Sequence, residues 1–292
     1  MLSRSSLKKI FAASLSFALF AACEKSPLEG EISNPPNLEI RGRIHLADNN
    51  SPEGIHVWMG NTALTTRTDK DGAFVLALPP SASGSPVYAG GIFNLYFYVA
   101  NYKLISTPVT VHEGKFLYSR GEVNQNGELI STLSMPKLLN IKTTVDPPVV
   151  PPNFSQTIRV SVALSAVHDS VMVVFPKMIG GQLGGVVFRE LDSGKIYADA
   201  PEDNAGTRAV EKIGNEPRLF RFDFNLKPGI LPLGNYEIIP YFLIEQQNMP
   251  GGLLVSISER AGEIGPDFLK IPFRREGGLF VIRDVQGQDR NE

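Results

Sequence analysis

Residues that could take part in metal or acid–base chemistry are scattered singly along this chain of 292 residues. The four histidines are His45, His56, His112 and His168, and none belongs to an H-E-x-x-H motif or to a pair four residues apart. A zinc site would need several such ligands close together, and the chain adds only one cysteine to them. The sequence therefore supports no metal site and no cofactor. His56 alternates with apolar neighbours on an expected strand, which predicts that its ring faces the surface.

Two pairs of acidic residues suggest chemistry of their own. Glu190 and Asp192 could act as the paired carboxylates of a glycan hydrolase, which is the alternative function for this chain. Their spacing places both on the same side of one expected strand, a commonplace arrangement, and an acid pair facing each other across a cleft would favour the enzyme. Asp69 and Asp71 could bind calcium, but an apolar strand follows Gly72 where an EF-hand-type loop would need a glutamate. The sequence therefore predicts a turn without metal.

Motifs for nucleophilic or phosphate chemistry are absent from the sequence. No G-x-S-x-G nucleophile elbow occurs. The glycine-rich run over residues 180–185 lacks the Lys-Ser/Thr of a phosphate loop and precedes an expected strand, so it predicts a hairpin loop. The sequence thus predicts no catalytic residues and a protein that is not an enzyme.

The first residues of the chain have the layout of a secretory signal. Arg4, Lys8 and Lys9 precede an uncharged stretch, residues 10–22, which ends at the single cysteine, Cys23. The run Leu19-Phe20-Ala21-Ala22-Cys23 resembles the lipobox of bacterial lipoproteins. This resemblance implies a signal peptide over residues 1–22 and a diacylglyceryl chain on the Cys23 thiol. The alternatives are an ordinary cleaved signal and an uncleaved membrane anchor, although the stretch is shorter than the roughly 20 apolar residues of a spanning helix.

Lipidation would make a membrane the first partner of the protein. Two or three acyl chains form a lasting anchor, whereas a single chain does not. In such lipoproteins an aspartate after the cysteine is associated with the inner membrane, and the residue here is Glu24. The resemblance therefore favours the outer membrane of a bacterial cell envelope.

Composition predicts an all-β protein. Apolar residues make up 42% of the chain, and its 22 prolines and 27 glycines fit short strands joined by turns. Without residues 1–22, 25 basic residues stand against 30 acidic ones, so a nucleic-acid partner is not expected. Residues 23–37 are polar and lack periodicity, which predicts a flexible tether after the lipid anchor.

Residues 38–144 alternate between apolar and polar side chains and predict the first of two tandem β-sandwich domains. The motifs are Gly42-Arg43-Ile44, Gly54-Ile55-His56-Val57 and a T-D-x-D-G-x-F run from Thr68 to Phe74, closed by Leu78-Pro79. At these residues the chain resembles the carboxypeptidase regulatory-like family. The resemblance implies a transthyretin-like sandwich of about seven strands, which in that family accompanies an enzyme.

A proline-rich stretch separates the two predicted domains. Residues 145–152 contain four prolines and predict an extended linker, although they could also form a proline-protected edge strand that opens the second domain. Residues 153–285 predict a second β-sandwich, expected to be immunoglobulin-like. Within it the run from Leu231 to Tyr236 resembles the tyrosine corner of immunoglobulin-like domains, which implies that the Tyr236 hydroxyl binds the preceding loop. Residues 286–292 predict a disordered tail.

One aromatic run could serve recognition. Tyr96, Tyr98 and Tyr102 alternate with the apolar face of an expected strand, which predicts an exposed row of tyrosines that could bind a partner. The alternative is that the rings pack under the loop 81–86 or against the second domain. The sequence thus predicts a non-enzymatic binding, adhesion or scaffolding module of the cell envelope, whose partner could be an envelope protein or a glycan.

Overall fold

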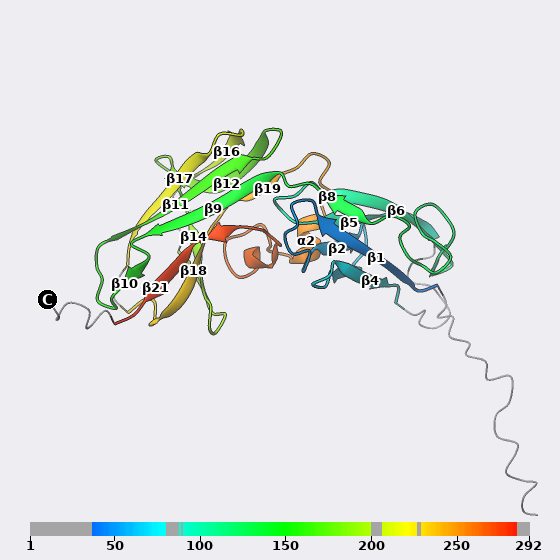
Figure 1. The fold of residues 1–292 in the computed structure, drawn as a ribbon, viewed down its shortest axis with the longest axis horizontal. Coiled ribbons are helices and arrows are strands. Elements are labelled where there is room, and N and C mark those ends of the chain that lie inside the picture. Colours follow the sequence, from blue (N-terminus) through cyan, green and yellow to red (C-terminus); the bar gives the residue numbers. More distant parts are fainter. Residues whose placement is uncertain (1–36, 80–87, 89, 200–205, 227–228, 285–292) are drawn as a thin grey trace, which may run out of the picture. The chain divides into compact units, whose positions relative to one another are not determined.

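The computed structural model describes residues 37–79, 88, 90–199, 206–226 and 229–284, and strands dominate them. The strands form five sheets, two from the first part of the chain and three from the second (Figure 1). Buried apolar residues lie between the sheets of each part. The predicted all-β class with two tandem β-sandwich domains is thereby confirmed.

Several predictions from the sequence fall outside these residues. The signal peptide, Cys23 and all of the tether except Asn37 precede them, the loop 81–86 is not among them, and the tail 286–292 follows them. Within the described part, no helix is both long and apolar enough to cross a membrane. From Leu38 onward the chain belongs to one compact unit.

A three-stranded sheet and a five-stranded sheet pack together in the first sandwich. In the smaller sheet, β1 pairs antiparallel with β4 and parallel with β8. The larger sheet has the order β3-β2-β5-β6-β7, and all of its neighbours are antiparallel. The strands are β1 Glu39–Leu46, β2 His56–Met59, β3 Thr65–Arg67, β4 Ala73–Ala77, β5 Gly90–Tyr98, β6 Ile105–His112, β7 Lys115–Phe116 and β8 Leu133–Met135.

Alternate residues of the two sheets make the first core. On β1, Ile40 and Ile44 are buried, and on β5, Leu95 and Phe97 are buried, because every second side chain of a strand points to the same face. Phe97 meets Phe74 of β4 edge to face, with ring centroids 5.5 Å apart. Burial of each such side chain stabilises the fold by roughly 1.5–3 kcal/mol.

The predicted turn from Asp69 to Gly72 is confirmed. Oδ1 of Asp69 accepts hydrogen bonds from the backbone N–H groups of Asp71 and Ala73, both at 2.9 Å. Gly72 has φ +78°, and a Cβ there would lie 2.0 Å from the carbonyl oxygen of Ile44, so only glycine fits. The turn connects β3 to β4, which belong to different sheets, and so it passes the chain between the layers instead of closing a hairpin.

The second sandwich places one sheet opposite two others. The continuous sheet has the order β17-β11-β9-β20, and the facing layer is divided into a sheet β13-β12-β16, with β19 also on β12, and a sheet β10-β21-β18-β14-β15 (Figure 1). The strands are β9 Leu139–Asp146, β10 Val149–Val150, β11 Thr157–Ala166, β12 Val171–Ile179, β13 Gln182–Leu183, β14 Val186–Glu190, β15 Ile196–Asp199, β16 Thr207–Ile213, β17 Arg218–Asn225, β18 Gly234–Pro240, β19 Leu243–Glu245, β20 Glu276–Gly277 and β21 Leu279–Ile282.

Two cores fill this sandwich, one under each sheet of the divided layer. At one end of β11, Val162 and Leu164 pack with Phe175 of β12, and at its other end Ile158 and Val160 pack under the other sheet. All four β11 residues lie on the same face of the strand, because they alternate in sequence. One long strand therefore serves both cores.

Two local features of this sandwich agree with the sequence. The hydroxyl of the fully buried Tyr236 donates to the Pro232 carbonyl oxygen at 2.7 Å, which confirms the predicted tyrosine corner. Gly180 and Gly181 have positive φ angles and connect β12 to β13, which confirms the hairpin predicted for residues 180–185.

The predicted boundary at residues 145–152 is wrong. β9 lies before it in sequence, yet β9 pairs along its whole length with β11 of the second sandwich. Within the predicted linker, β10 pairs parallel with β21, as the alternative of an edge strand anticipated. The prolines that suggested a boundary follow β9 and do not precede it. The first sandwich therefore ends at β8, and the second begins at β9.

A segment with little strand content, residues 246–275, follows β19. It contains the short helices α2, Leu253–Ile257, and η2, Phe268–Lys270. The two helices bury Leu253 and Phe268. The chain then enters β20, next to β9 in the continuous sheet.

Candidate functional site

The three tyrosines predicted to form an exposed row are largely covered by protein, so this prediction is wrong. Tyr98 and Tyr102 are 2% and 0% exposed, and the half-buried Tyr96 stacks on Trp58 with ring centroids 5.6 Å apart. Tyr102 belongs to the first core, where its hydroxyl donates to the carboxylate of Asp48 at 2.8 Å. Tyr96 and Tyr98 do point away from that core, but they pack with residues of the second sandwich, an alternative that the sequence left open.

His56 is also buried, at 3% exposure, contrary to its predicted position on the surface. Its Nε2 lies 2.8 Å from Oγ of Ser256, and that hydroxyl donates to the carbonyl oxygen of Leu253, so Nε2 is the donor. Burial, together with the charge of Arg67, lowers the pKa of His56 to about 4, so the ring is neutral at pH 7. His56 therefore joins the two sandwiches structurally.

The remaining candidate chemical residues are three histidines and the pair Glu190 and Asp192. His45, His112 and His168 are exposed, and no cluster of three or more possible metal ligands occurs among the described residues. Glu190 ends β14 and accepts a hydrogen bond from Ser193, whereas Asp192 lies in the following turn, 3.4 Å from the side-chain nitrogen of Asn235.

The contacts between the two sandwiches form a buried cluster that we call the joint. Its apolar members come from the outer face of β2 and β5 and the loop after β5, from β14, β18 and the connection after β18, and from the segment 246–275. They are Trp58, Tyr98, Ala100, Val187, Ile239, Tyr241, Leu253, Ala261, Phe268 and Ile271. Because these side chains are almost fully enclosed, the joint is packed like a domain core.

Polar side chains of the joint bind backbone groups. Asn101, fully buried, donates to the carbonyl oxygens of Leu139 and Arg274 at 3.1 and 2.7 Å and accepts from the Arg274 N–H at 2.9 Å. Gln246 accepts from the Leu104 N–H at 2.7 Å and donates to two carbonyl oxygens of the same loop. These two amides therefore satisfy backbone groups of β9, the loop after β5 and the segment 246–275.

Two arginines bind across the joint in the same manner. The guanidinium of Arg67 donates to the carbonyl oxygens of Gly54 and Lys270 at 3.1 and 2.7 Å. That of Arg274 donates twice to the Ser51 carbonyl oxygen, at 3.0 and 3.1 Å, and once to that of Glu53. Both arginines thereby connect the segment 246–275 to the first sandwich. Burial lowers the pKa of each.

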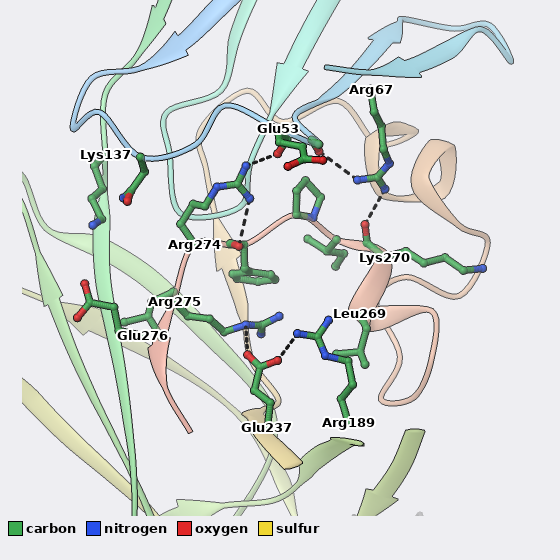
Figure 2. Close-up of a pocket in the computed structure, with 16 residues that line it drawn as sticks. Glu53, Arg67, Lys137, Arg189, Glu237, Leu269, Lys270, Arg274, Arg275 and Glu276 are labelled. Carbon is green, nitrogen blue, oxygen red and sulfur yellow. Dashed lines mark hydrogen bonds and ion pairs between the residues drawn. The ribbon is translucent and has the colours of Figure 1, made fainter. Parts of the chain in front are cut away.

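A pocket of about 360 Å³ opens beside the joint (Figure 2). Its walls combine β3 and loops of the first sandwich with β9, β14, β18, the segment 246–275 and the start of β20. Six cationic residues line it, namely Arg67, Lys137, Arg189, Lys270, Arg274 and Arg275, against three acidic ones, Glu53, Glu237 and Glu276. Cations surrounding a cavity of this size are suited to binding an anion.

On one wall of the pocket, a glutamate lies between two arginines. Arg189 of β14 and Glu237 of β18 are directly opposite in the sheet and form an ion pair. Nε of Arg275 lies 3.9 Å from the other oxygen of Glu237, as Figure 2 shows. Burial lowers the pKa of Arg275 to about 10, with Glu237 opposing this effect. The guanidinium also lies 5.1 Å from the centroid of the Phe273 ring.

This pocket could not be predicted from the sequence. Its residues come from six separate stretches, and no spacing relates Arg67 to Arg189 or to Arg275. The only local signal is the doublet Arg274-Arg275, which ends a segment without strand periodicity.

Comparison with known proteins assigns no family to the chain. No family model and no curated protein matches it. Among solved structures, the D312A variant of BcpA, the major pilin subunit of Bacillus cereus, is 10% identical, with 70% of this chain and 68% of that chain covered and a TM-score of 0.24. BcpA itself is 11% identical, with 68% of this chain and 63% of that chain covered and a TM-score of 0.20. The Bacillus anthracis TIE protein is 9% identical, with 72% of this chain and 48% of that chain covered and a TM-score of 0.22. These TM-scores are too low to support an argument about function.

Proposed function

We propose that this chain is a non-enzymatic, lipid-anchored scaffolding or binding module of the bacterial cell envelope, in which the two sandwiches act as one unit. The anchor is Cys23, and the outer membrane is the favoured location, as the lipobox resemblance implies. The partner is an envelope protein or a glycan.

The joint is the observation that supports a scaffold. Contacts between domains of one chain usually resemble transient interfaces, which allow the domains to move. Here ten apolar residues are buried together, and Asn101, Gln246 and Arg274 bind backbone groups across the contact. Opening the joint would expose the apolar cluster and leave buried polar groups without partners, each at a cost of about 1–3 kcal/mol. A fixed spacing between two domains suits a scaffold, which holds its binding partners at defined positions.

Calorimetry of the full chain tests the single unit. We expect one cooperative transition with a calorimetric enthalpy equal to the van't Hoff enthalpy, because the joint couples the sandwiches. Two well-separated transitions in the unaltered protein would contradict the proposal that the sandwiches act together.

Cell fractionation tests the anchor separately. Cys23→Ser removes the thiol that would carry the lipid, so we expect the protein to leave the membrane fraction or to accumulate as a precursor. Mass spectrometry of the unaltered protein should find acyl chains on Cys23. An unchanged mass and an unchanged membrane fraction in the variant would exclude lipidation.

A further inference from the structure

The charges around the pocket are only partly neutralised by the protein. Two of the six cations have carboxylate partners outside the lining: Lys137 lies 3.1 Å from Asp48, and Lys270 lies 2.6 Å from Asp267. Four arginines and three glutamates remain. Of the glutamates, Glu53 and Glu276 are exposed at the surface, and only Glu237 is largely buried, at 15% side-chain exposure.

The arginines on the upper wall in Figure 2 keep their charge although their hydrogen bonds are made. Arg67 and Arg274 donate to carbonyl oxygens, as described above. A carbonyl oxygen satisfies a donor but carries no net negative charge, so both guanidinium groups remain a source of positive potential at the pocket.

Arg275 is the least satisfied of these cations. Its side chain is 15% exposed, and the 3.9 Å from its Nε to Glu237 is too long for a hydrogen bond. Glu237 already binds Arg189 through its other oxygen. Among the described residues, none accepts a hydrogen bond from the Arg275 guanidinium, which lines the cavity in the centre of Figure 2. A buried guanidinium with free donors beside an open cavity is well placed to bind a ligand that brings the missing acceptors.

We propose that this pocket binds a compact oxyanion, the phosphate or carboxylate group of a small molecule, with Arg275 as the main donor and Arg189 as a second one. The planar fork of a guanidinium matches two oxygens of either group. A cavity of about 360 Å³ has room for such a group together with one sugar-sized body. Phe273 and Leu269 give that body an apolar wall.

Isothermal titration of the full chain in detergent tests the proposal. The probes are inorganic phosphate, glucose 6-phosphate and glucuronate, each at constant ionic strength, with chloride as the reference anion. We expect saturable binding with one site of at least one probe. Tighter binding of glucose 6-phosphate than of phosphate would identify a phosphate carried on a larger body, and tighter binding of glucuronate would identify a carboxylate.

Substitutions then locate the site. Because a charge-assisted hydrogen bond is lost, we expect Arg275→Gln to weaken binding at least about tenfold and Arg189→Gln to weaken it less. Arg275→Lys keeps the charge but loses the fork, so its affinity should fall between those of Arg275→Gln and the unaltered protein. The matched control is Arg260→Gln, since Arg260 is exposed, pairs with Glu263 and lies outside the pocket.

Two results would overturn the proposal. One is that no probe binds or raises the melting temperature of the unaltered protein more than chloride does. The other is that Arg189→Gln and Arg275→Lys bind the probe as tightly as the unaltered protein does, which would exclude both arginines as donors to the ligand. Both measurements remain decisive if Arg275→Gln fails to fold. Neither depends on lipidation at Cys23 or on a single melting transition.

Discussion

The two faces of β5 are both buried at the end of the strand, from Leu95 to Tyr98, but they are buried in different ways. Phe97 on one face belongs to the first core, which the first sandwich builds from its own two sheets. Tyr98, the next residue, belongs to the joint, where β14, β18 and the segment 246–275 cover it. Alternation along a strand therefore shows that two faces exist, and it does not show whether solvent or another domain covers the second face.

The two regions also differ in how polar groups contribute. The first core consists of apolar side chains and Tyr102, and the buried Thr68 of the same sandwich binds backbone groups of Pro52 and Ile55 within that sandwich. The joint adds amides and guanidinium groups that bind the backbone of the opposite side. Apolar burial is non-directional, whereas hydrogen bonds require defined distances and angles. We infer that the apolar cluster stabilises the joint and that the polar contacts fix the relative position of the two sandwiches.

The largest expected effect on folding comes from dividing the chain, either after the proline-rich stretch 145–152 or before β9. We expect the fragment 153–292 to remain unfolded, because it lacks β9 and the buried residues Leu139, Ile141 and Val145. The fragment 138–292 keeps β9 and should unfold cooperatively in urea, as measured by circular dichroism. If both fragments fail, co-expression with residues 38–137 should rescue only the longer one. A cooperative transition of the fragment 153–292 would show that β9 is dispensable.

Substituting adjacent residues on the two faces of β5 compares the core with the joint directly. Phe97→Ala and Tyr98→Ala should each lower the free energy of unfolding by about 3–5 kcal/mol, because each removes a buried ring. Ile92→Ala on the same strand is the control, since Ile92 is 77% exposed and should cost less than about 0.5 kcal/mol. Urea unfolding of the full chain measures all three. A cost for Tyr98→Ala as small as that of the control would mean that the joint is open in solution.

Removing one amide of the joint tests the polar contacts. Asn101→Ala leaves two carbonyl oxygens and one N–H without their partner, so we expect a loss of about 2–4 kcal/mol and a second transition in calorimetry. Asn140→Ala is the matched control, because Asn140 is exposed on β9. Equal melting curves for the two variants would show that the polar contacts contribute nothing to coupling.

Acidification should destabilise the joint more than the first core, because the buried His56 ring lies in the joint and becomes protonated at low pH. Its pKa in the folded protein, about 4, is below the ordinary value of 6.5, so folding favours the neutral ring. The resulting stability is present above about pH 6.5 and is lost as the pH falls towards 4, by roughly 2–3 kcal/mol at pH 4. In His56→Gln this part of the pH dependence should disappear, whereas in His45→Gln, on the exposed side of β1, it should persist. Identical pH profiles for His56→Gln and the unaltered protein would contradict this assignment.

Features that depend on neighbouring residues could be predicted from the sequence. The turn at Asp69 and the corner at Tyr236 were predictable because the interacting groups lie within five residues of each other. That β9 belongs to the second sandwich could not be predicted, because its partner β11 follows it at some distance in the sequence. The prolines between the two strands suggested a boundary instead.

The candidate site could not be predicted for the same reason. Arg275, Glu237 and Arg189 are brought together only when β14, β18 and the chain before β20 are in place. The sequence showed that His56 and Tyr98 lie on strands, but not that the second sandwich would cover them.

The backbone-directed contacts of the joint have a consequence for sequence variation. Asn101, Gln246 and Arg274 bind peptide groups at positions such as Ser51 and Leu104. Every residue type carries the carbonyl oxygen, and every type except proline carries the N–H. Where those partner residues have exposed side chains, as Ser51 does, the side chain could be exchanged without loss of the contact. Such exposed partner positions are thus free to diversify, while the side chains that bind their peptide groups hold the geometry constant.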